Sequence, residues 1–228
     1  MIELVVFDLD GTLMDSEARI VSAMQAAFVE QSLAAPSAAE VRAIIGLSLE
    51  QGVAQLHASA GDATRASLVG GYRRHYARGT RLPAPLFAHA EDTLSALAAD
   101  GRLLAMATGK SRSGLVQALA ETGVRRHFDA LRSADDCPPK PDPTMLREIL
   151  GELGVAPANA VMVGDTTFDL MMAHAAGMSA IGITHGMHAR SLLLDCRPHA
   201  LIDSLDALPP TLRALGADRH GGSRALPR

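Results

Sequence analysis

Two kinds of hydrophobic pattern divide the chain. Near its start, and again from about residue 86 onward, short apolar runs of strand length alternate with stretches of helical periodicity. The apolar runs lie at Glu3–Phe7, Leu103–Ala107, Ala130–Arg132, Ala160–Val163, Ala180–Ile183 and Ala200–Ile202. The helical stretches lie at Ala90–Ala99, Ser113–Thr122, Thr144–Leu153 and Phe168–Ala176. This alternation predicts parallel βαβ units, and therefore an α/β fold with a doubly wound, Rossmann-like parallel sheet.

Between residues 16 and 81 the pattern is helical throughout. Four helices are predicted there, at Ala18–Gln31, Ala38–Ile45, Leu49–Ala58 and Ala63–Arg78. The segment Pro83-Ala84-Pro85 then marks a stiff return to the α/β pattern. We therefore expect residues 16–81 to form an all-helical cap domain, inserted into an α/β core made of residues 1–15 and 82–216. Residues 217–228 are rich in Gly and Arg without periodicity, which predicts a disordered tail.

Composition restricts the class of protein. Of 228 residues, 48% are apolar and 20% are charged, and the net charge of −4 lacks the positive surplus typical of nucleic-acid binding. No apolar run is long enough to cross a membrane, and an acidic Glu3 near the start argues against a signal peptide. The two cysteines, Cys137 and Cys196, fit neither a metal-site spacing nor a disulfide framework. We expect a cytoplasmic monomer or homodimer that binds neither nucleic acid nor membrane.

The usage of basic residues is skewed. Of 21 basic residues, 19 are arginines, and the two lysines are Lys110 and Lys140. A lysine that persists among so many arginines suggests a need for a compact ammonium group, although chance is the simpler explanation for a pair. The positions of the two lysines therefore have to show whether either ammonium group has a function.

Polar side chains follow several of the predicted strands. In a doubly wound sheet, ligands bind at the carboxyl ends of the strands, so residues at those ends are the candidate site. Asp8 and Asp10 follow the first run, and their spacing of two places both side chains on one face of an extended chain. The later runs are followed by Thr108-Gly109-Lys110, by a loop that holds Lys140, and by Asp165 and Asp169.

Four carboxylates at one sheet edge repel one another unless a cation lies among them. A hard divalent cation such as Mg²⁺ takes oxygen ligands and shares its coordination sphere with water or phosphate. Asp165 and Asp169 are four residues apart, which predicts that they share one face at the start of a helix. With Lys140 as a further positive charge, the pattern indicates a site for a phosphate carried on magnesium.

The chain resembles the haloacid dehalogenase-like (HAD) hydrolase superfamily. Four segments carry the resemblance in the family's order: "DLDGT" after the first strand, a strand that ends in "TG", the "KPDP" loop, and "GDTTFD". It covers the chain from Ile2 to about Leu215, with the helical insertion where the class-one cap belongs. The segments "AIIGLSLEQ" and "ITHG" are most similar to the phosphoglycolate phosphatase-like branch.

The resemblance implies roles for the site residues. Asp8 resembles the nucleophile that accepts the phosphoryl group, and Asp10 resembles the general acid/base whose backbone carbonyl also binds metal. Asp165 resembles a direct Mg²⁺ ligand, and Asp169 an outer-shell group that orients a metal-bound water or Lys140. In the family, three groups hold the transferring phosphoryl oxygens, and the residues that resemble them in this chain are Thr108, Gly109 and Lys140.

Departures from the family's patterns narrow the reaction. Asp10 argues against dehalogenation. Dehalogenases that resemble this fold lack the second aspartate of the first motif, because their reaction has no leaving oxygen that needs a proton. The helical insertion contains no lysine, which excludes the Schiff-base chemistry of phosphonate-cleaving relatives, and Glu17–Val21 lacks the histidine of sugar-phosphate mutases. The resemblance thus implies Mg²⁺-dependent hydrolysis of a small phosphorylated metabolite through an aspartyl-phosphate. The alternatives are a phosphotransferase or mutase, a pyrophosphatase, or a catalytically silent binding module.

The helical insertion offers arginines as partners for an anionic substrate. These are Arg19, Arg42, Arg65, Arg73, Arg74 and Arg78. Which of them meets a substrate depends on geometry that the pattern does not contain. The function of Lys110 is equally open at this point.

Overall fold

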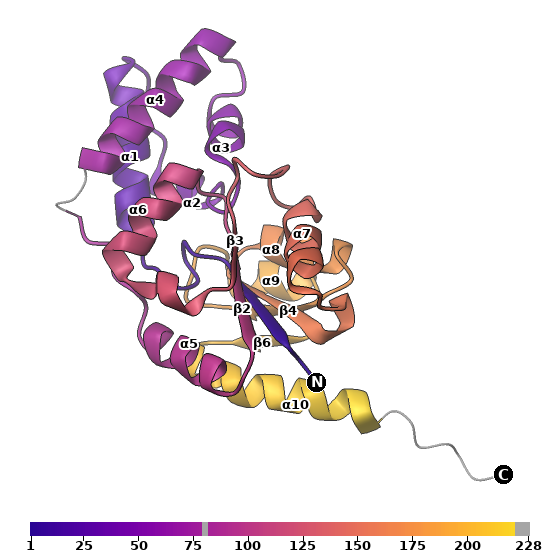
Figure 1. Cartoon of the computed structure of the whole chain (residues 1–228). Coiled ribbons are helices and arrows are strands. Elements are labelled where there is room, and N and C mark those ends of the chain that lie inside the picture. Colours follow the sequence, from indigo (N-terminus) through magenta and orange to yellow (C-terminus); the bar gives the residue numbers. More distant parts are fainter. Residues whose placement is uncertain (79–81, 222–228) are drawn as a thin grey trace.

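A six-stranded parallel sheet forms the centre of the molecule (Figure 1). The computed structural model describes residues 1–78 and 82–221. The strands are β1 (Leu4–Phe7), β2 (Leu103–Ala107), β3 (Ala130–Arg132), β4 (Ala160–Gly164), β5 (Ser179–Ile183) and β6 (Ala200–Ile202). Their order is β3-β2-β1-β4-β5-β6, and each neighbouring pair is parallel. The predicted doubly wound α/β fold is confirmed. Because the order reverses direction beside β1, this strand lies at the point where such sheets bind ligands.

Both faces of the sheet are covered by helices. Val5 and Phe7 of β1 pack into a core with α5 (Ala90–Ala99), α6 (Arg112–Thr122) and α10 (Leu208–Gly221). Leu4 and Val6 point to the opposite face. There they pack with residues of α7 (Thr144–Leu153), α8 (Thr167–Ala175) and α9 (Arg190–Asp195). Since all four β1 residues are buried, the strand is continuously apolar rather than alternating.

Two helices were not predicted from the sequence. These are α9 and α10, and α10 extends to Gly221. Residues 217–221 are therefore helical, and the expectation of a disordered tail from residue 217 is wrong for them. Residues 222–228 of that expectation lie outside the described residues. Three short 3₁₀ helices complete the connections, at Val124–His127, Pro157–Asn159 and Leu205–Ala207.

Residues 16–78, which we call the helical block, have a hydrophobic core of their own. Its helices are α1 (Glu17–Glu30), α2 (Ala38–Arg42), α3 (Leu49–Leu56) and α4 (Asp62–Arg78). Serine caps start two of them: Ser37 forms a capping box with Glu40, and Ser48 accepts a hydrogen bond from Gln51 N. Figure 1 shows the block at the opposite end of the molecule from α10.

The helical block leaves and rejoins the sheet through neighbouring segments. Asp15 N donates to Pro85 O at 2.8 Å, and Phe87 N donates to Leu13 O at 2.9 Å. Ser16 is the N-cap of α1 and makes no side-chain cap bond. The paired connections hold the block beside the carboxyl end of β1.

A buried arginine joins the helical block to the rest of the fold. The Arg19 side chain of α1 forms an ion pair with Glu121 of α6, with 2.7 Å between Nη1 and Oε2. Its Nε donates to Leu82 O at 2.8 Å. Because an uncompensated buried charge is costly, both contacts fix where the block lies on α6.

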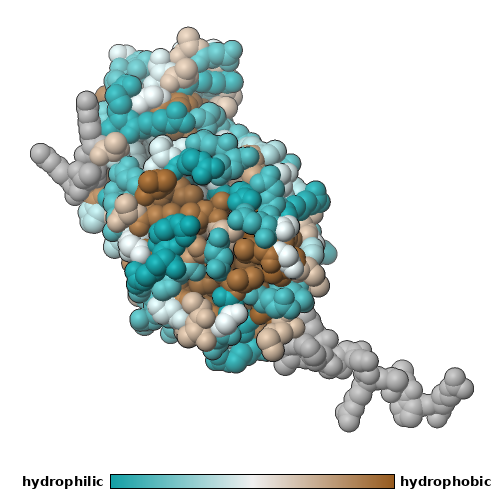
Figure 2. All heavy atoms as spheres, in the orientation of Figure 1, coloured by the Kyte–Doolittle hydropathy of each residue, from teal (hydrophilic) through white to brown (hydrophobic). Residues whose placement is uncertain are grey.

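The surface is mixed in polarity. Figure 2 shows mostly hydrophilic atoms over the helical block in this view, with hydrophobic residues gathered nearer the middle of the molecule. Val116 of α6, which is 63% exposed, is among the exposed large hydrophobic residues. In the described part of the chain, no helix combines the length and apolarity needed to span a bilayer.

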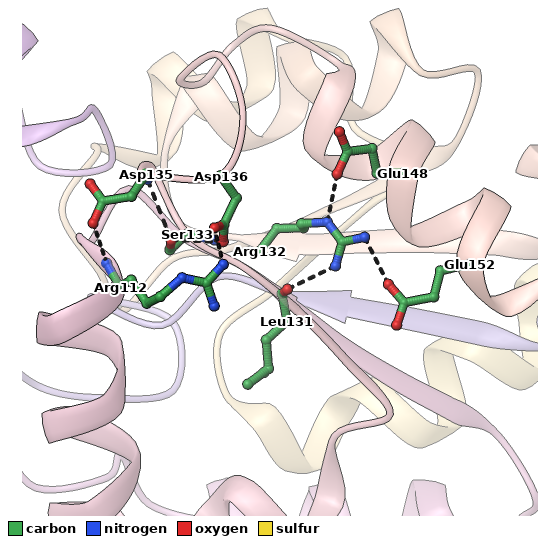
Figure 3. Close-up of polar contacts among 8 residues, drawn as sticks. All are labelled: Arg112, Leu131, Arg132, Ser133, Asp135, Asp136, Glu148 and Glu152. Carbon is green, nitrogen blue, oxygen red and sulfur yellow. Dashed lines mark hydrogen bonds and ion pairs between the residues drawn. The ribbon is translucent and has the colours of Figure 1, made fainter.

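The loop that follows β3 is fastened by its own acidic side chains (Figure 3). Asp136 Oδ2 accepts hydrogen bonds from Ser133 N and Ser133 Oγ, both at 2.8 Å, and Oδ1 pairs with Arg112. Asp135 Oδ2 accepts a hydrogen bond from Arg112 N at 2.8 Å. These two aspartates hold the loop against the start of α6.

The other side of this loop is fixed by α7. In Figure 3, the guanidinium of Arg132 reaches Glu148 and Glu152, at 2.8 and 2.7 Å. Asp142 accepts from Thr144 N at 2.9 Å, where α7 begins. The segment that carries Lys140 is thus anchored at both of its ends.

We predict that Asp136→Ala destabilises the protein by about 1–3 kcal/mol, because two buried donors of Ser133 lose their acceptor. Burial raises the pKa of Asp136, but hydrogen bonds from Ser133 and the charge of Arg112 outweigh it, so this pKa lies below its ordinary value. The stabilisation is therefore complete above the unfolded-state pKa of about 3.9 and is lost as the pH falls through the folded-state pKa. Urea unfolding at several pH values measures it.

The matched control is Arg112→Ala, whose side chain is largely exposed and keeps its backbone contact with Asp135. We expect it to cost less than about 1 kcal/mol, as surface ion pairs do. Equal costs for the two variants would contradict the assignment of the loop's stability to Asp136 and Ser133.

Candidate active site

Three buried carboxylates meet at the carboxyl ends of β1 and β4. Asp8 follows β1, Asp165 follows β4, and Asp169 lies in the first turn of α8. Each offers one carboxylate oxygen, and the three oxygens lie within 4.8 Å of one another. The sheet thus brings together residues that are far apart in the sequence.

Asp165 is held by hydrogen bonds to both of its oxygens. Thr12 Oγ1 donates to Oδ1 at 2.7 Å, and Met187 N donates to Oδ2 at 2.8 Å. Gly11 allows this approach: its φ is +82°, and a Cβ there would lie 2.2 Å from Asp165 Oδ2. Burial raises the pKa of Asp165 well above its ordinary value, and the charges of Asp169 and Asp8 raise it further.

Asp165 and Asp169 do not share a helix face, contrary to the sequence prediction. The helix α8 begins at Thr167, so Asp165 lies before it. Asp169 instead forms a capping box with Thr166, accepting hydrogen bonds from Thr166 Oγ1 at 2.7 Å and from Thr166 N at 3.1 Å. The two carboxylates meet because the turn after β4 folds back toward the first turn of α8.

Lys140 bridges two of the carboxylates. Its ammonium group is fully buried and lies 2.8 Å from Asp8 Oδ1 and 2.7 Å from Asp169 Oδ1. Burial alone lowers the pKa of Lys140, but the charges of Asp169 and Asp8 outweigh it, so this pKa lies above its ordinary value. Lys140 is therefore a fixed positive charge beside Asp8.

Both carboxylate oxygens of Asp8 are buried, and neither has a hydrogen bond from a residue that the structure describes. Oδ1 lies in the ion pair with Lys140. Burial raises the pKa of Asp8 to about 7, with Lys140 opposing the rise and Asp169 and Asp10 adding to it. Three carboxylates with one lysine leave an excess of negative charge, which fits a divalent cation.

Asp10 points to a different set of partners. Ser16 Oγ donates to its Oδ1 at 2.5 Å, and Lys110 Nζ lies 2.9 Å from its Oδ2. Lys110 also donates to the Tyr76 hydroxyl of α4 at 3.0 Å. Burial lowers the pKa of Lys110, but Asp10 and Tyr76 reverse the effect and leave this pKa raised. The function of Lys110 that the sequence left open is thus to pair with Asp10.

The turn after β2 lies under the helical block. Thr108 is buried, and its Oγ1 accepts a hydrogen bond from Lys110 N at 3.2 Å. A Cβ on Gly109 would lie 2.4 Å from Leu47 O and 2.6 Å from Gly46 O. Glycine is needed here because the backbone of the block passes directly over it.

A pocket of about 320 Å³ lies between this edge of the sheet and the helical block. Asp8, Asp10, Thr108, Gly109 and Lys110 line one side. The opposite side consists mainly of apolar residues from the block. The candidate residues at the ends of β1 and β2 therefore share one cavity.

The arginines of the helical block are engaged elsewhere. Arg42 pairs with Glu17, Arg73 with Glu50, Arg74 with Glu30, and Arg19 with Glu121. Arg65 Nη2 donates to Ala58 O. Among the described side chains of this group, Arg73 alone lines the pocket, and the side chain of Arg78 lies outside the described residues. The geometry therefore reduces the set of candidate anion partners to one.

Several contacts in the site were missed by reasoning from sequence. Thr12 and Ser16 orient Asp165 and Asp10, and both carry hydroxyl groups within a few residues of the first motif, so a signal was present. Tyr76 lies on a helix with no motif of its own. His185 donates to Thr12 O at 3.1 Å and stacks on Phe87.

Residues 5–183 match the model of the haloacid dehalogenase-like hydrolase family. The chain belongs to this family. The match contains all four motifs, and the prediction that the protein is a HAD-like hydrolase is confirmed.

Similar proteins include phosphatases by name. A protein named "Probable phosphatase IndB" from Dickeya dadantii (strain 3937) is 36% identical over 216 residues, covering 93% of this chain and 94% of that protein. A phosphoglycolate phosphatase from Yersinia pseudotuberculosis is 32% identical over 213 residues, covering 91% and 92%. The predicted resemblance to the phosphoglycolate phosphatase-like branch is confirmed.

Solved structures share the fold of this HAD-like hydrolase. A crystal structure described as a predicted phosphoglycolate phosphatase from Haemophilus somnus 129PT has a TM-score of 0.82 at 25% identity, covering 92% of this chain and 97% of that one. A structure described as a predicted phosphatase from Clostridium acetobutylicum has a TM-score of 0.84 at 22% identity, covering 94% and 99%.

We predict that Gly109→Ala destabilises the protein by about 1–3 kcal/mol, because the new methyl group overlaps backbone atoms that have to move. The matched control is Gly151→Ala inside α7, where a Cβ meets no atom within 4 Å. That change should stabilise the protein by about 0.5–1 kcal/mol through helix propensity. Thermal unfolding measures both. A stable Gly109→Ala variant would contradict the close approach of the block.

Proposed function

We propose that this HAD-like hydrolase is a Mg²⁺-dependent phosphatase that cleaves a small phosphate monoester through an aspartyl-phosphate. The observation that carries the proposal is the state of Asp8: it lines the pocket, neither of its oxygens has a hydrogen bond, and Lys140 forms an ion pair with Oδ1 alone. A carboxylate fixed on one oxygen and free on the other is prepared for nucleophilic attack. The phosphatase names of the relatives support the same reaction class.

In the first step, Asp8 Oδ2 attacks the phosphorus atom of the substrate. The bond from phosphorus to the leaving oxygen breaks, and Asp10 transfers its proton to that oxygen, so a neutral alcohol leaves. In the second step, Asp10 removes a proton from water as the water attacks the phosphorus. The bond between Asp8 and phosphorus then breaks, which releases phosphate and restores both aspartates.

The phosphoryl group is held by residues around Asp8. Thr108 and Gly109 line the pocket next to the nucleophile and supply hydroxyl and backbone donors for the phosphoryl oxygens. Lys140 adds a fixed positive charge, which offsets the charge that develops on these oxygens. The site thus provides stabilisation that is already in place before the reaction begins.

Magnesium would be held by Asp8, by Asp165 and by the backbone carbonyl of Asp10, with Asp169 in the outer shell. When bound, the ion neutralises phosphoryl charge, which lets one anion approach another. Asp169 has the outer role because its carboxylate pairs with the Lys140 ammonium group, while its other oxygen accepts from Thr166. Its contact with Lys140 keeps that side chain directed at Asp8.

We further propose that residues 16–81 are a cap domain over a core of residues 1–15 and 82–216. Its own hydrophobic core and its paired connections support this division. The cap would exclude water from the pocket and open to release product. We place the enzyme in the cytoplasm, as a monomer or homodimer, on the composition described above.

We predict that Asp8→Asn lowers kcat for p-nitrophenyl phosphate by about 10⁴-fold or more, because the amide replaces the nucleophile. The control is Asp15→Asn, which changes an exposed carboxylate near the site and should retain activity. Circular dichroism checks that both variants are folded. Substantial turnover by folded Asp8→Asn, free of wild-type enzyme, would refute the aspartyl-phosphate.

A separate prediction concerns the metal. Activity should require Mg²⁺ and be abolished by EDTA, and Asp165→Asn should raise the Mg²⁺ concentration for half-maximal activity by about tenfold or more, because a ligand charge is lost. The measurement is a Mg²⁺ titration of initial rates for both proteins. Hydrolysis without a divalent ion, or an identical titration curve for Asp165→Asn, would remove Asp165 from the metal site.

A further inference from the structure

We propose that the alcohol released by this enzyme is compact, uncharged and largely apolar. The inference rests on the proposed phosphatase function and concerns the part of the pocket that faces the leaving group. A pocket of about 320 Å³ is at the small end for ligand sites, which favours a compact substrate.

The wall opposite Asp8 and Asp10 is built from apolar side chains. Ile20 and Met24 come from α1, Ile44 and Leu47 from the segment before α3, and Leu49 from its first turn. Four of these five are buried, and Leu49 is partly exposed. A leaving group that fills this space exchanges water for hydrocarbon contacts, so apolar atoms bind there favourably.

Two aromatic rings extend the same wall. Tyr72 and Tyr76 of α4 stack at 5.6 Å between centroids, and both line the pocket. Burial raises the pKa of the Tyr72 hydroxyl, so this group is neutral. The neutral hydroxyl of Tyr72 and the faces of both rings suit an uncharged leaving group.

The cations that line the pocket already have acidic partners. Lys110 pairs with Asp10 at 2.9 Å, and its side chain is 8% exposed. Arg73 pairs with Glu50 at 2.9 Å, and half of its side chain is exposed. In the described lining, no cation is left unpaired for a second anionic group of a substrate.

These observations disfavour a leaving group with a carboxylate, such as that of phosphoglycolate. A carboxylate in this wall would lose its hydration without gaining a free cation, which is costly. A neutral group of the same size has no charge hydration to lose. The pocket wall of this chain therefore fits an alcohol other than glycolate, although relatives such as one of 32% identity are named for phosphoglycolate.

The test is a set of phosphate esters that all release a primary alcohol. We would measure kcat/KM with Mg²⁺ for 2-phosphoglycolate, for its neutral counterpart n-propyl phosphate, and for n-butyl and benzyl phosphate. We expect n-propyl phosphate to exceed 2-phosphoglycolate by about tenfold or more, with a further rise for the larger neutral esters. Because the leaving oxygens are alike, the differences report on the pocket wall.

Two variants place the effect on the wall. Leu49→Arg adds an unpaired cation at a partly exposed position and should raise kcat/KM for 2-phosphoglycolate relative to n-propyl phosphate by about tenfold. The matched control is Val29→Arg, on the same helical block but 63% exposed and outside the pocket lining, which should leave the ratio unchanged. Arg73→Gln should also leave this ratio of kcat/KM values unchanged, so that the neutral ester is still the better substrate.

The outcomes separate this inference from the function on which it rests. A preference for 2-phosphoglycolate over n-propyl phosphate, lost in Arg73→Gln, would overturn the inference and assign Arg73 to the substrate carboxylate. The phosphatase function would still stand if hydrolysis required Asp8. If no ester, p-nitrophenyl phosphate included, is cleaved by folded protein with Mg²⁺, the proposed function itself fails.

Discussion

The buried ammonium group of Lys140 is the contact on which the site depends. It lies within 2.8 Å of Asp8 and 2.7 Å of Asp169, and no part of its side chain reaches solvent. Removing one partner from a buried ion pair costs about 3–5 kcal/mol, because the remaining charge loses both water and its counter-charge. The ion pairs of Lys140 therefore form only when the loop after β3 and the turn before α8 are held in one arrangement. The aspartates around Ser133 and the capping box of Thr166 achieve this.

A second polar network joins the helical block to the sheet. Asp10 pairs with Lys110, and Lys110 donates to Tyr76 of α4. Arg19 of α1 lies over the Tyr76 ring and pairs with Glu121. The block thus places the Tyr76 hydroxyl against Lys110, the partner of Asp10, so a movement of the block would alter the surroundings of Asp10. The helical block and the candidate active site are coupled through these contacts.

Much of the fold was predictable because it follows from local pattern. The strands at Leu103–Ala107, Ala130–Arg132 and Ala200–Ile202 begin and end as predicted, since short runs of mainly apolar residues mark strands of this length in the sequence. The helices α9 and α10 were missed: α9 is short, and α10 is stabilised by packing against the sheet rather than by periodicity alone. Asp165 shows a related limit, because spacing suggested a shared helix face where the chain instead makes a turn.

The sequence by itself determined which residues stand at the carboxyl ends of the strands, because strand periodicity and the order of the motifs are local properties. It therefore predicted that Asp8, Lys140 and Asp165 meet. Only the tertiary structure decided what each charge touches. It paired Lys110 with Asp10 and four arginines of the block with glutamates, and it lined the pocket mainly with apolar side chains. The physical reason is that an ion pair depends on distances of a few ångströms between segments far apart in sequence, and packing alone sets those distances.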